Sequence, residues 1–217
     1  MKTAIVRDMI DVCHRLYARG FVAATDGNVS ARLPSGSLLT TRAGLNKGLA
    51  TEGDLVKVSA NGQQLEGKAK PSTELRMHLA IYRQRPDVQA VVHAHPVYAT
   101  AFAVAGIALD RPVLPEVLVG LGGIPLARYA TPSTEGVGAS LKPFIKHNSA
   151  ILLQNHGVVT LGTDLHDAYF KMEKVEQVAR IVYLATQLGG ARELSAEEIE
   201  QLRSVATVAY GREIPKT

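Results

Sequence analysis

Apolar residues recur every three or four positions in several stretches of the chain, which is the period of a helix with one buried face. The longest stretch begins at Asp164, a good N-cap residue, and continues to Gly189-Gly190. Another opens the chain and ends at Arg19-Gly20, a basic last turn followed by a residue that commonly terminates helices. These patterns predict helices over residues 5–19, 71–85, 135–146, 164–188 and 195–210.

Short apolar runs bounded by turn residues predict the strands. The dipeptide Asn61-Gly62 is a strong signal for a two-residue hairpin, and Asn155-His156-Gly157 indicates a turn between two further runs. We expect strands over residues 38–41, 55–59, 63–65, 90–94, 124–129, 150–153 and 158–161. Because hairpin signals alternate with helices, the sequence predicts one α/β domain over residues 1–217, with a central, mostly antiparallel sheet flanked by helices.

The composition is that of a globular protein, with 46% hydrophobic and 20% charged residues. The net charge of +4 is mild and the basic residues are scattered, so we expect a small anionic ligand rather than nucleic acid. Cys13, the one cysteine, lies on an apolar stripe and indicates packing in a reducing, cytoplasmic setting. Arg7, Asp8 and Asp11 interrupt any signal peptide, and polar residues interrupt the uncharged stretch 89–109, so we expect neither secretion nor a membrane span.

Three histidines are candidate metal ligands. His93 and His95 alternate along a predicted strand, so both imidazoles project from the same face. That spacing suits one ion, and imidazole favours zinc and its neighbours, although a pair of buried, hydrogen-bonded histidines explains the spacing equally well. His156 favours the metal because it occupies a turn directly after an apolar strand, and an open catalytic site needs a third ligand.

The start of the second predicted helix carries another group of polar residues. Glu74 alone is most simply explained as a carboxylate that complements the helix dipole. Ser72 and Thr73, however, place hydroxyls and backbone N–H groups at the same helix start, an arrangement that suits a phosphate. The segments 26–30 and 41–44 are two further predicted loops with glycines and hydrogen-bond donors, and each is a weak signal when taken alone.

Five motifs follow one another along the chain: G-N-V-S at 27–30, T-x-x-G at 41–44, K-P-S-T-E at 70–74, H-A-H-P at 93–96 and Q-N-H-G at 154–157. In order and spacing they resemble the class II aldolase and adducin family, specifically its L-fuculose-1-phosphate aldolase branch. The resemblance extends from the first helix to Tyr210-Gly211 and therefore covers nearly the whole chain.

The resemblance implies a zinc-dependent lyase that cleaves a ketose 1-phosphate, such as L-fuculose 1-phosphate or a related deoxypentulose 1-phosphate. The products would be dihydroxyacetone phosphate and an aldehyde, formed through a metal-stabilised enediolate. One Zn²⁺ per subunit would be held by His93, His95 and His156, with Glu74 as an additional ligand and as the acid–base residue. Proton transfer by Glu74 calls for a pKa raised toward neutrality. The phosphate would bind four further residues: Asn28, Gly44, Ser72 and Thr73.

The match departs from the aldolases at two places. Ala43 stands where relatives often carry a hydroxyl, so we expect Arg42 or Lys47 to compensate in binding the phosphate. Glu116 stands where aldolases place a proton-donating tyrosine, whereas methylthioribulose-1-phosphate dehydratases use a glutamate in that region. The alternatives are therefore such a dehydratase or a pentulose-phosphate 4-epimerase. The adducin head, a cytoskeletal binding module with this fold, is disfavoured because its metal histidines would be expected to be lost.

The resemblance also predicts the assembly. Tyr210 matches an aldolase tyrosine that reaches the active site of the neighbouring subunit, which implies a homotetramer with sites between subunits. Of the other polar residues, His78 lies one turn after Glu74 and is expected on the helix surface. We place four tyrosines in the core: Tyr17, Tyr82, Tyr98 and Tyr169.

Overall fold

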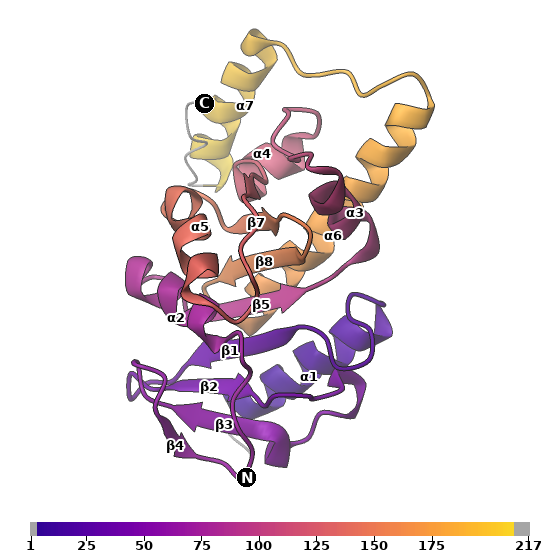
Figure 1. Cartoon of the computed structure of the whole chain (residues 1–217). Helices are drawn as coiled ribbons and strands as arrows, with labels where there is room; N and C mark the ends of the chain where they lie inside the picture. The colour runs from indigo at the N-terminus through magenta and orange to yellow at the C-terminus, as the bar shows by residue number, and fades with distance from the viewer. Residues whose placement is uncertain (1–3, 211–217) are drawn as a thin grey trace.

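The computed structural model describes residues 4–210, and within them one eight-stranded sheet runs through the molecule (Figure 1). The strand order is β4-β3-β2-β1-β5-β8-β7-β6, and every neighbouring pair is antiparallel except β6 and β7. The strands are β1 (Asn28–Arg32), β2 (Leu38–Thr41), β3 (Leu55–Val58), β4 (Gln64–Glu66), β5 (Ala90–Ala94), β6 (Leu126–Ala127), β7 (Ala150–Leu153) and β8 (Gly157–Gly162). The predicted fold class, an α/β protein with a mostly antiparallel sheet flanked by helices, is confirmed.

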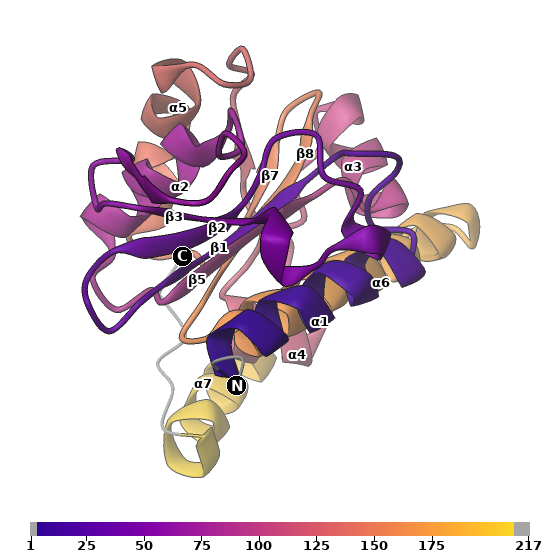
Figure 2. The same ribbon diagram turned by 90° about the horizontal axis from the view of Figure 1, so that it is seen from below.

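Helices cover both faces of this sheet (Figure 2). One face packs against α1 (Ala4–Ala18), α3 (Val97–Ala105), α4 (Pro115–Leu121) and α6 (Leu165–Gln187). The other face packs against α2 (Leu75–Gln84) and α5 (Glu135–Ile145). None of the helices within residues 4–210 has the length and apolar character that a membrane span requires.

The alternation of side chains along the central strand β5 explains how both faces are buried. Ala90, Val92 and Ala94 belong to the core beneath α1 and α6, whereas Val91 belongs to the core beneath α2 and α5. His93 points to the same face as Val91, since residues two apart share a face. The strand β5 is fully buried, so a histidine at this position is enclosed by protein.

Besides the three-residue 3₁₀ helices Lys47–Leu49 and Glu52–Asp54, three elements were not predicted from the sequence. The segment 26–30, which the sequence predicts to be a loop, contains the start of β1, because polar side chains on the α2-facing side of this strand obscure its alternating pattern. The helix α3 is apolar nearly all round and lacks the polar face that identifies a surface helix. The short helix α4 has only seven residues, too few to show a period. Conversely, only Leu126–Ala127 of the expected strand 124–129 pairs with the sheet.

The predicted burial of individual side chains is mostly confirmed. Cys13 is completely buried, and burial raises the pKa of its thiol to about 12, as expected for a packing residue. Tyr82 and Tyr169 are buried, and Tyr98 is half-buried. The prediction for Tyr17 is wrong: it is 44% exposed, because it follows Leu16 and therefore leaves the apolar stripe of α1.

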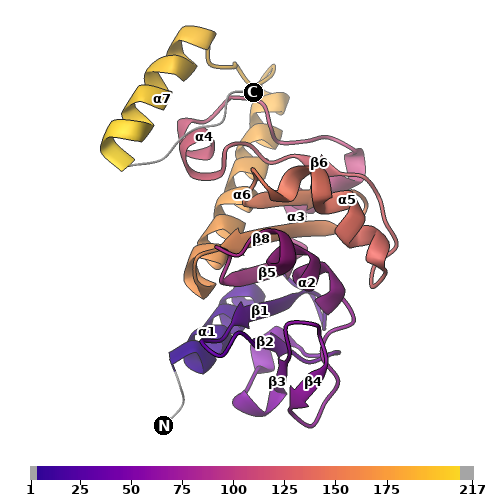
Figure 3. The ribbon, with the colours of Figure 1, turned by 90° about the vertical axis from the view of Figure 1, so that its left-hand side faces the viewer.

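The last helix, α7 (Ala196–Tyr210), stands apart from the rest of the molecule (Figure 3). The predicted capping box is present, because the Ser195 N–H donates to Glu198 Oε2 at 2.7 Å and the Glu198 N–H donates to Ser195 Oγ at 3.2 Å. The helix α7 contacts the rest of the described chain through a small apolar cluster around Leu118 of α4 and Ala206 of α7. Two apolar side chains of α7, Val205 and Val208, remain exposed.

Candidate metal centre and phosphate loops

The three histidines predicted as ligands come together at one end of β5. His93 lies within β5, His95 follows the end of that strand, and His156 occupies the turn between β7 and β8. One ring nitrogen from each histidine lies within 4.8 Å of the other two. One central strand, the residue that follows its end and one turn therefore aim three imidazoles at a single point.

A backbone hydrogen bond fixes the orientation of the most buried ring. His93 has no solvent exposure, and its Nδ1–H donates to the Val158 carbonyl of β8 at 2.9 Å. The Nε2 atom of His93 is thereby left to face the centre, 3.1 Å from His95 Nε2. Burial, assisted by His93 and His156, lowers the pKa of His95 to about 4, so this imidazole is neutral at pH 7, as metal binding requires.

Glu74 completes the cluster. It occupies the N-cap position of α2, but its side chain makes no cap hydrogen bond and is directed to the histidines instead. Its Oε2 lies 3.3 Å from His93 Nε2, and its Oε1 lies 3.2 Å from His156 Nε2. Asn28 Nδ2 donates to the same Oε2 at 2.8 Å. Three imidazole nitrogens and one carboxylate form a donor set that fits a zinc ion.

The pKa of Glu74 differs from the expectation. Burial alone would raise the pKa of this carboxyl group, but the adjacent His93 and His156 outweigh burial and hold the pKa well below its usual range. The expected rise toward neutrality is therefore not found, and Glu74 is a carboxylate at neutral pH. A carboxylate is the form that accepts a proton.

Two acidic residues outside the cluster hold the segment that follows β5. Glu176 of α6 accepts hydrogen bonds from the Tyr98 and Ala99 N–H groups, at 3.0 and 2.9 Å, and so caps the start of α3. Asp26 Oδ2 lies 3.6 Å from His95 Nδ1. Glu176 was not among the predicted site residues. In the sequence it appears only as a carboxylate beside the apolar stripe of a long helix.

His78 is buried, not on the helix surface as expected. Its Nδ1 lies 2.6 Å from Ser30 Oγ, which in turn lies 2.9 Å from the Tyr82 hydroxyl. The face of α2 that carries His78 is the face that packs on the sheet, and β1 presents Ser30 to it. Burial lowers the pKa of His78 to about 3, with a smaller contribution from His93.

The two predicted phosphate loops lie side by side. The Ala43 N–H donates to the Lys70 carbonyl at 2.9 Å, and the Ser72 N–H donates to the Thr41 carbonyl at 3.1 Å. This pairing holds residues 71–73 out of the helix, so α2 begins later than predicted. Three of the predicted phosphate residues lie on these paired loops and are exposed or partly exposed: Gly44, Ser72 and Thr73. The fourth, Asn28, is buried against Glu74.

Both residues expected to compensate for Ala43 make contacts within the chain. Arg42 pairs with Asp54, its Nε lying 2.7 Å from Oδ1. Lys47 is 1% exposed, and its Nζ donates to the Thr25 and Leu45 carbonyls, each at 2.8 Å. Burial lowers the pKa of Lys47 to about 8. Arg42 therefore ties the 41–44 loop to Asp54, and Lys47 ties the following turn to the backbone at Thr25.

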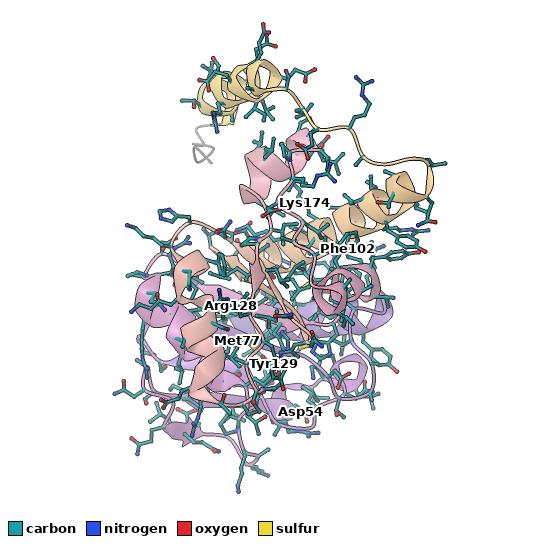
Figure 4. The ribbon with its side chains drawn as sticks, turned by 45° about the horizontal axis from the view of Figure 1, so that its top comes forward. Asp54, Met77, Phe102, Arg128, Tyr129 and Lys174 are labelled. Carbon is teal, nitrogen blue, oxygen red and sulfur yellow. The ribbon has the colours of Figure 1, made fainter. Side chains whose placement is uncertain are left out.

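Glu116 does not join the cluster within one chain. Glu116 is exposed on α4, where its carbonyl accepts a hydrogen bond from Lys174 Nζ at 3.4 Å. Figure 4 shows Lys174 beside α4 and well separated from Asp54, which marks the 41–44 loop. Tyr210 ends α7, and its side chain lies outside the part of the chain that the structure describes.

The family model of the class II aldolase and adducin N-terminal domain matches residues 7–183. The chain belongs to the class II aldolase and adducin family. The family predicted from the five motifs is thus confirmed, and with it a lyase of the class II aldolase type. Class II aldolases are metal-dependent, and the three-histidine group could hold the ion.

Two kinds of enzyme stand among the relatives of this class II aldolase. The 3-oxo-tetronate 4-phosphate decarboxylase of Escherichia coli (strain K12) is 35% identical over 210 residues, covering 94% of this chain and 97% of that protein. An L-fuculose phosphate aldolase of Methanococcus maripaludis is 37% identical over 185 residues, covering 83% of this chain and 97% of that protein. The chain is therefore similar to both.

Two solved structures share the fold. YgbL from Escherichia coli superimposes with a TM-score of 0.86 at 34% identity, covering 92% of this chain and 98% of that one. An L-fuculose 1-phosphate aldolase superimposes with a TM-score of 0.85 at 29% identity, covering 93% of this chain and 95% of that one. The architecture is thus shared along nearly the whole chain.

Gly157→Ala is expected to weaken metal binding. A Cβ at this position would lie 2.5 Å from His95 Cδ2 and 2.7 Å from the Ala94 carbonyl oxygen, so the imidazole would have to move. Because displacement of a ligand or its support typically costs 10- to 100-fold in metal affinity, we expect a loss of at least about tenfold. Zinc competition against a chromophoric chelator measures it. Gly53→Ala, whose Cβ would meet nothing closer than 3.8 Å, is the matched control, and equal affinity in both variants would contradict the prediction.

Stability is expected to fall in acid partly through His78. Its pKa is about 3 in the folded chain and about 6.5 when unfolded, so its contribution is fully present above pH 6.5 and is lost as the pH falls toward 3. One extra proton in the unfolded chain corresponds to about 1.4 kcal/mol per pH unit. Urea unfolding between pH 7 and pH 5 measures this slope. His78→Gln should reduce the slope by that amount, and an unchanged slope would disprove burial of a neutral imidazole.

Proposed function

We propose that this class II aldolase is a zinc-dependent lyase that breaks a carbon–carbon bond in a phosphorylated sugar or sugar acid and leaves the enediolate of dihydroxyacetone phosphate. The observation that carries the proposal is the convergence of His93, His95, His156 and Glu74 beside the paired loops at 41–44 and 70–73. The first four supply a metal-binding set, and the loops supply donors for a phosphate.

The names of the two kinds of relatives support a common intermediate. Aldol cleavage of a ketose 1-phosphate removes an aldehyde from the carbon next to the ketone. In a 3-oxo acid with a phosphate on carbon 4, the carboxyl group is attached to carbon 2, which is also the carbon next to the ketone, and it leaves as carbon dioxide. Both reactions leave the electron pair of the broken bond in the same enediolate, and protonation at carbon then gives dihydroxyacetone phosphate.

Each part of the site has a role in this chemistry. A zinc ion, when bound, stabilises negative charge on the enediolate oxygens. Glu74 transfers the proton at carbon, and Asn28 together with the neighbouring imidazoles holds its carboxylate in place. Ser72, Thr73 and Gly44 bind the phosphate, which serves as the remote handle that fixes the orientation of the reacting carbons.

Aldol cleavage is our first candidate reaction. The phosphate loops, Glu74 and Tyr210 all match the aldolase branch of the family. Decarboxylation is the second candidate, and a specific observation favours it: Glu116 replaces the aldolase tyrosine. A departing aldehyde exchanges a proton at its oxygen, whereas departing carbon dioxide needs no such donor. The similarity to decarboxylases over 94% of the chain points the same way.

We also propose a homotetramer with active sites between subunits. The helix α7 contacts the body of the chain chiefly at α4 within the described residues (Figure 3). Glu116, which lies on α4, lines a groove together with Phe170 and Ile181. The outer surface of α6 carries exposed apolar side chains that a neighbouring subunit would cover: Phe170, Ile181, Tyr183, Leu184 and Leu188. Glu116 and Tyr210 would then serve the site of a neighbour.

Product analysis separates the candidate reactions. We expect dihydroxyacetone phosphate from the zinc-loaded enzyme, detected by coupled reduction, because both candidate reactions end in its enediolate. An accompanying aldehyde from a ketose 1-phosphate identifies the aldolase, and carbon dioxide from a 3-oxo sugar acid phosphate identifies the decarboxylase. A product with the whole carbon skeleton, as a dehydratase or 4-epimerase would give, from every substrate tested would refute the proposal. Glu74→Gln, which keeps the shape of the side chain but accepts no proton, is the inactive control.

Removal of residues 207–217 tests the action of Tyr210 in trans. We expect zinc content near that of the full chain, because the histidines lie far from α7, and a rate reduced by at least about tenfold, or about 1.4 kcal/mol of transition-state stabilisation. Tyr210→Phe separates the hydroxyl from the rest of the segment. If the truncated enzyme remains fully active, the C-terminal segment has no catalytic role.

A further inference from the structure

The segment that joins β6 to α5, residues 128–134, bridges the two halves of the site, and we call it the strap. Near its start, the Tyr129 N–H donates to Gln154 Oε1 at 3.1 Å, next to the turn that carries His156. Near its end, Ser133 Oγ donates to Thr73 Oγ1 at 2.8 Å, on the phosphate loop. Figure 4 labels Arg128 and Tyr129 at the start of the strap, and the next residue, Ala130, packs against the core cluster that contains Met77 of α2.

Ser133 adopts a backbone conformation that serine seldom adopts. Its φ of +64° lies in the left-handed region, which costs a residue with a Cβ roughly 1–2 kcal/mol. A glycine would adopt the same conformation without this cost. Strained residues of this kind cluster at ligand clamps. The strained backbone of Ser133 is therefore consistent with a role of its hydroxyl group in binding.

The hydrogen bond from the Ser133 hydroxyl determines the direction in which the Thr73 hydroxyl can donate its own proton. A hydroxyl group has one donor and two acceptor positions, so the proton of Ser133 occupies one acceptor position of Thr73 Oγ1. The proton of Thr73 must then point away from Ser133. Since this is the one side-chain hydrogen bond that the described part of the chain shows for Thr73, its own proton is left to donate to a ligand. A phosphate, whose oxygens are strong acceptors, is the ligand that such a donor suits.

We propose that Ser133 is a positioning residue for phosphate binding: it orients the Thr73 hydroxyl as a donor and, through the strap, ties the phosphate loop to the turn of His156. This inference rests on the proposed role of Ser72 and Thr73 in binding the substrate phosphate. It adds a residue outside all five sequence motifs to the binding machinery. It also predicts that stability and phosphate affinity respond differently when the Ser133 hydroxyl is removed.

Calorimetric titration of the zinc-loaded full chain with inorganic phosphate and with dihydroxyacetone phosphate tests the proposal. Ser133→Gly removes the hydroxyl and relieves the backbone strain. We expect at least about fivefold weaker binding of both ligands, while the midpoint of thermal unfolding does not fall. Thr134→Ala is the matched control, because it removes another hydroxyl of the strap, one that donates to the Thr131 carbonyl at 2.7 Å and does not touch Thr73. Its affinity should equal that of the unaltered chain.

A double variant shows whether Ser133 acts through Thr73. In a Thr73→Val background, Ser133→Gly should cause no further loss of affinity, because the hydroxyl that it orients is absent. Unaltered affinity in Ser133→Gly, equal losses in Ser133→Gly and Thr134→Ala, or additive losses in the double variant would each overturn this inference and leave the phosphate loop in place. If the unaltered chain binds neither ligand, or Thr73→Val binds as well as it does, the phosphate loop itself is refuted and the inference falls with it.

Discussion

The hydrogen bond from His93 Nδ1 to the Val158 carbonyl is the constraint around which the site is built. It joins two central strands and fixes which nitrogen of a fully buried ring faces the centre. Glu74 and the other two histidines then approach that nitrogen from a helix start, a strand end and a turn. Because these segments are far apart in the sequence, the rigid middle of the sheet is what holds the donor set together.

This arrangement explains why polar residues are buried on one face of the sheet. Asn28 lies opposite His93 in the β1–β5 ladder and contacts Glu74, and Ser30 lies two residues further on and contacts His78. A buried polar side chain is costly unless it is hydrogen-bonded, so these contacts are what make a polar face tolerable inside the protein. The same contacts hold α2, and thus Glu74, against the sheet.

The sequence was sufficient for features with a local signal. His93 and His95 were found because a strand places alternate residues on one face, and His156 because it lies in a turn after an apolar strand. The family resemblance was needed for Glu74, whose local pattern indicates only a helix start. Contacts between distant segments leave no such local signal. The sequence therefore does not reveal that β1 is a strand, that His78 is buried against Ser30, that Glu176 caps α3, or that Ser133 contacts Thr73.

The central claim is that three imidazoles converge to hold one catalytic zinc ion, and metal analysis tests it most directly. Elemental analysis of gently purified protein should find about one zinc per chain, as in open sites with three protein ligands. Removing zinc with a chelator should abolish activity, re-addition should restore it, and His93→Ala should lose both zinc and activity while remaining folded. Full activity in the metal-free protein, or zinc content unchanged by His93→Ala, would contradict the account.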